Sequence, residues 1–390
     1  MGGLPLEGVR VLDLSRLLPG PYATLVLADL GADVVKVEDP QGGDYVRWMP
    51  PLAGEQSGFF HALNRNKRSL RLDLKRPAGP AVLRRLVRRF DVVVESFRPG
   101  VMDKLGVGYA ALRAETPRVV LCSISGYGQD GPYRERAGHD LDYCATAGVL
   151  ALNGPPEGPL PPGVQVADVA GGSWPAVAGI LAALVRRAAT GEGAHLDVSM
   201  TDGALAMLAL QLGAAAARGV PLRRGEEILN GGSACYGVYR TRDGRFVALG
   251  ALEPKFFQRF CEAAGRPDLA GRQFDRDGRG PRAELTALFA SRTRDEWARL
   301  GAEHDCCLAP VLEGDEPARD PQLVARGMFL SVETPWEGKA MASLRTPVRM
   351  AGAERPPSPA PRLGQDTRAV LAEAGFGEAE IASLEAAGVA

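Results

Sequence analysis

Short apolar runs alternate with helical apolar patterns through the first third of the chain. Residues 9–14 form a short apolar run that is a candidate for a buried strand, and residues 22–30 carry helical spacing that ends at Gly31. A second strand is expected at 33–38, which completes a strand–helix–strand unit. The same alternation returns in the elements expected at 68–74, 77–90, 91–95, 118–124, 172–188, 195–198 and 200–218. This order predicts an α/β fold with a parallel sheet.

The second half of the chain changes character near residue 228. Residues 236–240 and 245–249 flank a Thr-Arg-Asp-Gly sequence, which is a strong signal for a β-hairpin. Helical patterns follow, and from residue 331 the chain is rich in proline and poor in periodicity, so this segment must run over another surface. We expect a large α/β domain at 1–227, a smaller α+β domain at 228–330 and a C-terminal segment at 331–390.

Composition excludes some functional classes without indicating one. The chain has 390 residues, enough for two domains, and 45% of them are hydrophobic. A net charge of −1 does not indicate a nucleic-acid or membrane-surface binder. No apolar run free of charge and glycine reaches the roughly 18 residues of a membrane span. The six cysteines lack metal-ligand spacing, so we expect reduced thiols, no bound metal and a cytoplasmic location, with core packing as the default for Cys306 and Cys307.

Two common nucleotide-binding signatures are missing from the chain. The first strand is not followed by Gly-x-Gly-x-x-Gly, and no Walker pattern is found. Positive charge is nevertheless concentrated between residues 65 and 98, which contain eleven Lys and Arg. This excess could meet an anionic small molecule, although a solvated helix face is the commoner explanation for the arginines at 84–89.

The candidate chemistry lies between residues 137 and 174. His139 and Asp168 stand on either side of a Gly/Pro-rich connection, and each precedes an Ala-rich apolar run. A histidine gains and loses a proton near neutral pH, and burial raises the pKa of a carboxyl toward the same range. Two such bases on opposite sides of one acidic carbon can invert its configuration. Residues 169–173 are expected to begin a helix whose free N–H groups face the resulting anion.

The same residues also have a purely structural explanation. A histidine before an apolar run is more often a capping or core residue, and an aspartate before a helix is usually an N-cap. Asp140 and Asp142 are cap candidates on the same grounds, and we favour that role for Asp142. The spacing by itself does not show that His139 and Asp168 meet, so the pattern supports an α/β enzyme with acid–base chemistry and no more.

Several longer motifs are specific when they are taken together. They are Leu-Leu-Pro-Gly-Pro at 17–21, the segments 29–38 and 63–70, Glu-Ser-Phe-Arg-Pro-Gly at 95–100, Ser-Gly-Tyr-Gly-Gln-Asp-Gly-Pro at 125–132, and the stretch 137–174. With this series the chain resembles the class III CoA-transferase superfamily (the CaiB/BaiF family) over nearly its full length. Within that superfamily it is most similar to the α-methylacyl-CoA racemases.

The resemblance implies one of two chemistries. Transferases of the superfamily use an aspartate as a covalent nucleophile, and Asp168 falls at that position. Racemases use the same aspartate as one base and the histidine of a Gly-His-Asp motif as the other, which here implies His139 followed by Asp140. They also carry a supporting glutamate in Gly-x-x-Glu-Pro, which here is Glu253. Both marks favour a 2-methylacyl-CoA racemase, while the loop at 45–60 is more typical of transferases and leaves the acyl chain open.

The resemblance also implies how the substrate and the subunits are arranged. The large domain would be Rossmann-like and built from both chain ends, and two chains would thread through each other in an interlocked homodimer. Coenzyme A would enter as part of the acyl-CoA substrate, with no prosthetic group. Its phosphates would meet Lys36, Arg65, Lys67 and Arg98, with Gly138 also in contact.

Overall fold

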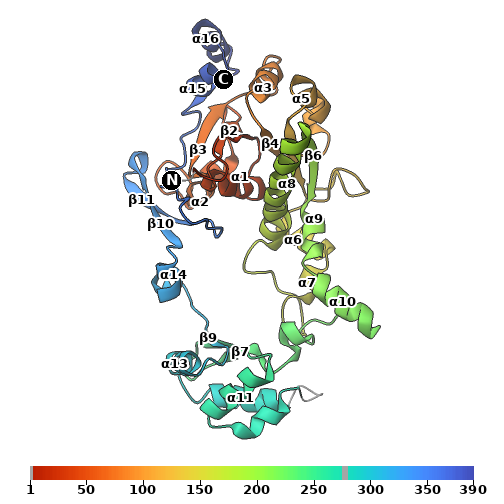
Figure 1. Cartoon of the computed structure of the whole chain (residues 1–390), viewed down its shortest axis with the longest axis vertical. Helices are drawn as coiled ribbons and strands as arrows, with labels where there is room; N and C mark the ends of the chain where they lie inside the picture. Colours follow the sequence, from red (N-terminus) through yellow and green to blue (C-terminus); the bar gives the residue numbers. More distant parts are fainter. Residues whose placement is uncertain (1–2, 275–279) are drawn as a thin grey trace. The chain divides into compact units, whose positions relative to one another are not determined.

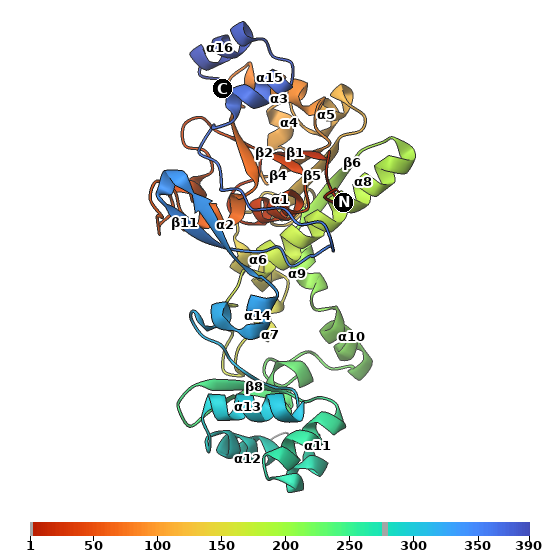
Figure 2. The same cartoon turned by 60° about the vertical axis from the view of Figure 1, so that its left-hand side comes forward.

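The computed structural model describes residues 3–274 and 280–390, which divide into two compact units (Figure 1, Figure 2). The larger unit comprises residues 1–147, 164–207 and 321–390, and the smaller unit comprises 148–163 and 208–320. Residues 208–227 therefore belong to the smaller unit, ahead of the boundary expected at 228. The chain also returns to the larger unit at Pro321, before the expected residue 331. Both chain ends contribute to the larger unit.

A six-stranded parallel sheet lies at the centre of the larger unit, in the order β3-β2-β1-β4-β5-β6. Its strands are β1 (Arg10–Asp13), β2 (Asp33–Glu38), β3 (Lys67–Arg71), β4 (Val92–Glu95), β5 (Val120–Ser125) and β6 (Ala194–Ser199). The central strands are rich in valine and buried on both faces, as is typical of parallel sheets. The predicted parallel α/β sheet is confirmed. The strand order reverses between β1 and β4, and such a switch point is where open α/β sheets bind ligands.

Helices cover both faces of this sheet. One face packs against α1 (Pro19–Asp29) and α8 (Trp174–Thr190). The opposite face packs against the following helices: α3 (Gly79–Val87), α5 (Tyr109–Glu115), α15 (Thr367–Glu373) and α16 (Glu378–Ala386). The stretch Val166–Thr190 is long and apolar enough by composition to cross a membrane, but its contacts with α1, β5 and β6 are those of a core helix.

Shorter elements complete the larger unit. They are η1 (Tyr45–Trp48), α2 (Gly58–Asn64), α4 (Val101–Lys104), α6 (Asp140–Thr146), the π-helical turn η2 (Val166–Ser173), α9 (Met200–Ala206), α14 (Pro321–Ala325) and a hairpin of β10 (Phe329–Thr334) and β11 (Lys339–Leu344) with η6 (Pro335–Glu337) at its turn. The sequence did not predict this hairpin, because most of its side chains are exposed on both faces and show no apolar alternation.

The smaller unit is built on a three-stranded antiparallel sheet in the order β7-β8-β9. The sheet comprises β7 (Tyr236–Arg240), β8 (Phe246–Gly250) and β9 (Leu308–Pro310), and β7 and β8 form the predicted hairpin. The remaining elements are α7 (Val149–Leu152), α10 (Ala209–Arg218), η3 (Ile228–Gly232), α11 (Pro254–Ala263), η4 (Pro267–Arg272), α12 (Gly280–Phe289), α13 (Arg294–His304) and η5 (Glu316–Arg319). The core is aromatic, with Phe260 stacked on Phe289 and in contact with Trp297. The single helix expected at 200–218 is interrupted between α9 and α10.

Candidate active site

Four of the residues proposed for chemistry and binding line one pocket of the larger unit. The pocket has a volume of about 490 Å³, and its walls include Arg98, Gly138, His139 and Asp168. The other walls come from the residues that follow β1, from Ser96 to Pro99 after β4, from the end of β5 and from the loop before α6. The pocket therefore lies at the carboxyl edge of the sheet, next to the switch point of the strand order.

His139 stands immediately before α6 with its side chain exposed. Its backbone N–H donates to the Asp142 carboxylate at 2.9 Å, as expected if Asp142 serves as a capping residue. The Tyr143 hydroxyl donates to the carbonyl oxygen of Gly138 at 2.5 Å. A Cβ atom on Gly138 would lie only 2.7 Å from the Tyr143 ring, so this close approach requires glycine. These contacts fix the backbone on both sides of His139 and leave the imidazole in the pocket.

Asp168 lies inside the π-helical turn η2 rather than ahead of a helix. The helix begins at Val166, and the Val169 N–H donates to the Gln165 carbonyl oxygen at 3.1 Å. The expectation that a helix begins after Asp168 and presents its first N–H groups to an anion is therefore wrong. π-helical turns are rare in proteins, and those that do occur are often found at functional sites. Here the turn carries a partly buried carboxylate to the wall of the pocket.

Glycines after Asp168 explain how η2 is held. A Cβ atom on Gly171 would lie 2.6 Å from the Met200 carbonyl oxygen, and one on Gly203 would lie 2.0 Å from the Gly171 carbonyl oxygen. The backbones of η2 and α9 therefore pack directly on each other. The Ser173 hydroxyl donates to the carbonyl oxygen of Pro19 at 2.7 Å, which ties the same turn to α1.

Asp140 joins the two halves of the site. Its carboxylate accepts the backbone N–H of Asp168 at 2.9 Å, which brings the start of α6 against η2. The pKa of Asp168 is raised to about 6, chiefly by burial and also by the negative charge of Asp140, while His139 opposes the shift. A carboxyl with this pKa can gain or release a proton near neutral pH, as acid–base catalysis requires.

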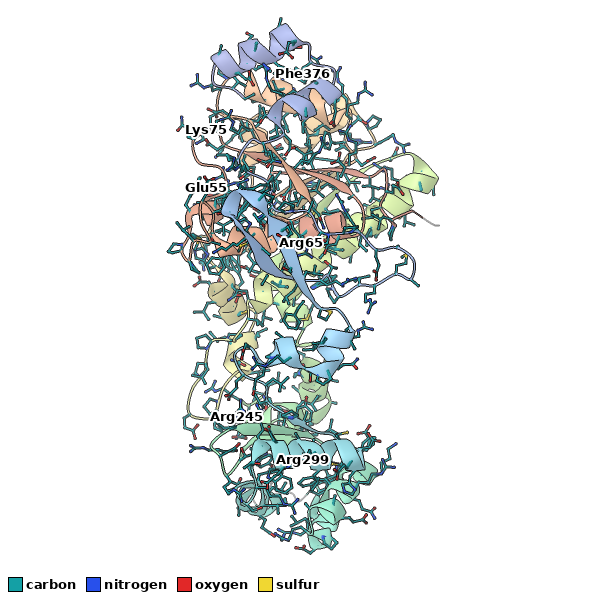
Figure 3. The ribbon with its side chains drawn as sticks, turned by 90° about the vertical axis from the view of Figure 1, so that its left-hand side faces the viewer. Glu55, Arg65, Lys75, Arg245, Arg299 and Phe376 are labelled. Carbon is teal, nitrogen blue, oxygen red and sulfur yellow. The ribbon has the colours of Figure 1, made fainter. Side chains whose placement is uncertain are left out.

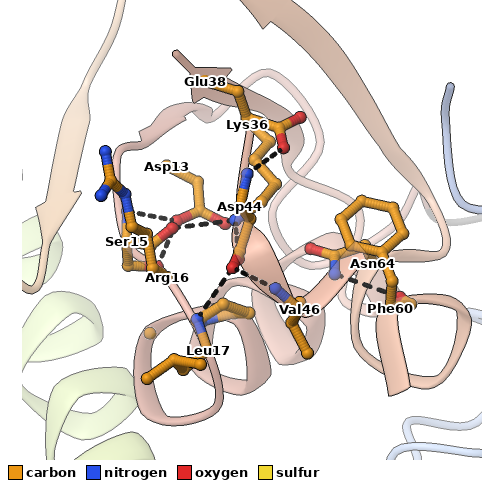
Figure 4. Close-up of polar contacts among 12 residues, drawn as sticks. Asp13, Ser15, Arg16, Leu17, Lys36, Glu38, Asp44, Val46, Phe60 and Asn64 are labelled. Carbon is orange, nitrogen blue, oxygen red and sulfur yellow. Dashed lines mark hydrogen bonds and ion pairs between the residues drawn. The ribbon is translucent and has the colours of Figure 1, made fainter. Parts of the chain in front are cut away.

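Lys36 and Lys67 lie outside this pocket, in a buried cluster of charges. Figure 4 shows Lys36 of this cluster beside Asp13 and Asp44. Lys36 Nζ donates to the Ser15 carbonyl oxygen at 2.8 Å and pairs with Asp44 at 3.0 Å. Lys67 Nζ pairs with Asp13 at 3.1 Å. It also donates to three further oxygens, of Pro21, Thr24 and Asn64.

These contacts leave neither lysine free to bind a phosphate. Burial lowers the pKa of Lys67 to about 8 although Asp13 opposes the shift. The two lysines together hold the pKa of Asp13 well below its usual range, in spite of its burial. A phosphate contact would break these ion pairs and hydrogen bonds, so the phosphate-binding role expected for Lys36 and Lys67 has no support in the structure.

Arg65 is also buried away from the pocket. Its Nη1 donates to the Ser343 hydroxyl of β11 at 2.8 Å, and its Nη2 pairs with Asp29. Figure 3 shows Arg65 beside the β10–β11 hairpin. The arginine therefore attaches the C-terminal hairpin to α1, which is a structural role that the sequence did not indicate.

The pocket also contains three arginines that were not predicted from the sequence, Arg16, Arg134 and Arg136. Arg16 and Phe97 also line a second cavity of about 230 Å³, which is bounded by the residues after β2 and β3 and includes Lys75. Lys75 is 80% exposed at the edge of the larger unit (Figure 3). The position of Arg16 directly after β1 was a usable signal, because ligands of α/β sheets bind at strand ends. The two cavities share Arg16 and Phe97, and together they offer a long site with basic side chains for an elongated anionic ligand.

Glu253 belongs to the smaller unit, immediately before α11, with an exposed side chain. Its carboxylate does not cap that helix. Its support of His139 stays a prediction.

Comparison with known proteins identifies the group to which these features belong. The family model described as CoA-transferase family III matches residues 6–367. The chain is 36% identical to alpha-methylacyl-CoA racemase from Homo sapiens, over 98% of this chain and 96% of that protein. It is also 36% identical to succinate–glutarate CoA-transferase from Agrobacterium fabrum, over 95% of each. The crystal structure of a CaiB/BaiF family protein from Brucella suis is similar with a TM-score of 0.83 and 35% identity, covering 96% of this chain and 100% of that one.

Proposed function

The chain belongs to CoA-transferase family III, whose members act on acyl-CoA thioesters, and we propose that it is a racemase of 2-methyl-branched acyl-CoA. The observation that carries this proposal is the presence of His139 and Asp168 in one pocket. A pKa of about 6 for Asp168 supports a role as a base and as an acid. The Gly-His-Asp motif at 138–140 favours the racemase over the transferase of the same family.

The proposed reaction moves one proton off the α-carbon and returns another to the opposite face. The thioester carbonyl makes the α-proton acidic and carries the negative charge of the enolate that forms. When neutral His139 removes the proton, protonated Asp168 supplies the other. In the reverse direction the Asp168 carboxylate removes the proton and the His139 imidazolium supplies one. Asp140 holds the Asp168 backbone and shifts its pKa toward neutrality, so it is a positioning residue.

We further propose that CoA occupies the long site formed by the two cavities that share Arg16 and Phe97. Arg16 lines both cavities and Arg98 lines the larger one, and their guanidinium groups can match phosphate oxygens with paired donors. Contacts to CoA far from the reacting carbon would hold the α-carbon between the two bases, which converts binding energy into orientation.

The racemase proposal is tested in heavy water with a 2-methylacyl-CoA of one configuration. NMR should show loss of the α-proton signal together with conversion to both epimers. His139→Ala should lose exchange at one face and racemisation together, because one of the two bases is missing. Full racemisation by that variant would end the two-base assignment.

The alternative function is a class III CoA-transferase with Asp168 as nucleophile. The observation in its favour is the relative from Agrobacterium fabrum, which is as similar in sequence as the racemase from Homo sapiens. Asp168 would attack the thioester carbonyl, which releases CoA as its thiolate and forms a mixed anhydride of Asp168 and the acyl group. The thiolate would then attack the Asp168 carbonyl, so that the first carboxylate leaves and a CoA thioester remains on Asp168. A second carboxylate would attack that thioester to form a new anhydride, and the released thiolate would take the new acyl group as acyl-CoA and restore Asp168. Hydroxylamine should trap the covalent intermediate at Asp168. A retained α-proton in the NMR experiment, together with trapping, would favour this alternative.

The interlocked homodimer, the supporting role of Glu253 and a cytoplasmic location also remain proposals. Large exposed apolar residues on α9 and α10, which include Leu205, Leu210 and Leu212, support association between copies. Light scattering after size exclusion should give the mass of two chains. A monomer that racemises its substrate would contradict the dimer, and unchanged activity of Glu253→Gln would contradict the role of Glu253.

A further inference from the structure

A second group of ionisable side chains lies beneath the pocket, and the proposed chemistry does not use it. Glu95 is the last residue of β4 and is only 4% exposed. In the sheet register it is aligned with Ser123 of β5, which in turn is aligned with Asp197 of β6. Side chains aligned across neighbouring strands point to the same face, so the three groups form one row near the carboxyl edge of the sheet.

Glu95 is directly bonded to the turn that builds the pocket. Its Oε2 accepts the backbone N–H of Phe97 at 2.7 Å. Phe97 lines both cavities, and its neighbour Arg98 lines the larger one. A side chain that accepts an N–H two residues ahead fixes the conformation of the turn between them. The Glu95 carboxylate therefore determines where Phe97 and Arg98 stand.

Asp197 makes the corresponding contact to the other wall of the pocket. Its carboxylate accepts the backbone N–H of Gln129 at 3.0 and 3.2 Å. Gln129 begins the loop that continues to Arg134, Arg136 and His139. The two carboxylates of the row thus hold the two loops between which a ligand would bind.

The surroundings of Glu95 make it sensitive to pH. The pKa of Glu95 is raised to about 7, chiefly by burial and also by the charges of Asp103 on α4 and Asp197 on β6. Hydrogen bonds from the Ser123 hydroxyl and the Phe97 N–H oppose the shift. The remaining ionisable neighbours are the buried Cys122 thiol on β5, and His195, whose Nε2 lies 3.0 Å from Ser123 Oγ and whose ring stacks on Tyr109.

We propose that Glu95 is a positioning residue for coenzyme A, because its buried carboxylate holds the turn that presents Phe97 and Arg98 to the ligand. The inference rests on the proposed binding of CoA and not on which reaction follows. An ionised carboxylate is a stronger acceptor for the Phe97 N–H than a protonated one. The turn is therefore held more firmly, and CoA is bound more tightly, as pH rises through the range in which Glu95 loses its proton.

The test is calorimetric titration of the full chain with free CoA between pH 6 and pH 8. Glu95→Gln should weaken binding by about tenfold at pH 8, which is the loss of one charge-assisted hydrogen bond, and by much less at pH 6. Glu192→Gln, which removes an exposed carboxylate far from the turn, is the matched control and should bind like the wild type. The phosphates of CoA also titrate near pH 6, but this changes the affinity of the wild type, Glu95→Gln and Glu192→Gln in the same way. A Glu95→Gln variant with wild-type affinity at every pH would overturn the proposal.

Ser123→Ala provides an independent test that keeps the carboxylate. Because the Ser123 hydroxyl lowers the pKa of Glu95, its removal should move the midpoint of the pH-dependent affinity upward. Circular dichroism establishes that each variant is folded, and if Glu95→Gln is not, Ser123→Ala decides alone. A folded Ser123→Ala with an unmoved midpoint would overturn the proposal. In the heavy-water assay Glu95→Gln should raise KM more than it lowers kcat. If the racemase proposal is wrong, the wild type will show no α-proton exchange, but the CoA titrations will still give the pH dependence described above.

Discussion

Two polar clusters at the carboxyl side of the same sheet differ in what their charges contact. In the buried cluster of Asp13, Lys36 and Lys67, each charge is withdrawn from solvent and paired with an opposite charge within about 3 Å. In the pocket, His139 and Arg98 are exposed, and burial together with the nearby charge of Asp140 raises the pKa of Asp168. The first arrangement stabilises the fold at the switch point, and the second keeps its charges available for a ligand. Pairing, rather than residue type, separates a structural charge from a functional one.

Replacement of Asp168 should give the largest effect on chemistry and a small effect on folding. Asp168→Asn should reduce α-proton exchange by about 10²- to 10⁴-fold, because an amide cannot act as the second base. The free energy of unfolding should change by less than about 1 kcal/mol, since the backbone contact to Asp140 is retained. Exchange is followed by NMR and stability by urea denaturation. A loss of several kcal/mol of stability would show that the two clusters do not differ in the way described.

In the buried cluster, a replacement should have a large effect on stability instead of on chemistry. Lys67→Met should lower the free energy of unfolding by about 3–5 kcal/mol, because Asp13 would be left as a buried charge without its partner. The matched control is Lys75→Met, which removes an 80% exposed ammonium and should change stability by less than about 0.5 kcal/mol. If the Lys67→Met variant is as stable as the wild type but binds CoA more weakly, Lys67 binds a phosphate of CoA after all.

Arg98 should affect binding without a large effect on stability. Arg98→Ala should weaken the binding of free CoA by about tenfold to a hundredfold, which corresponds to one charge-assisted contact. The affinity should also become less dependent on salt. Arg113→Ala on the exposed side of α5 is the control. Equal affinity of the two variants would remove Arg98 from the proposed site.

The smallest effect is a shift along the pH axis. In the direction in which the Asp168 carboxylate is the base, the rate should rise as pH passes through about 6. In the opposite direction, which needs protonated Asp168, the rate should fall over the same range. Asp140→Asn removes a charge that raises the pKa of Asp168, so both limbs should move to lower pH. The measurement is the pH dependence of the rate, taken separately with each epimer as the substrate. If both limbs stay at the same pH in Asp140→Asn, Asp140 is not a cause of the raised pKa of Asp168.

Local patterns were sufficient to predict the elements of the sheet. The strands at 33–38 and 91–95 and the hairpin after residue 236 follow from apolar runs and turn residues that are neighbours in the chain. The hairpin of β10 and β11 was not predictable, because its stability comes from contacts with distant residues such as Arg65. The π-helical turn around Asp168 was missed for a similar reason, since it depends on the packing of Gly171 against α9.

The parallel α/β class, the family resemblance and the candidate pair His139 and Asp168 follow from patterns along the chain. Which charges serve the fold and which face a ligand becomes visible only when the chain is folded. Lys36, Lys67 and Arg98 look alike in the sequence, as basic residues close to predicted strands. Lys67 is paired with Asp13, which lies far away along the chain, Lys36 is paired with Asp44 in the loop after its own strand, and Arg98 is not buried with them. The electrostatic role of a charge depends on its burial and on its partners, and both are set by residues that the fold, rather than the local sequence, brings together.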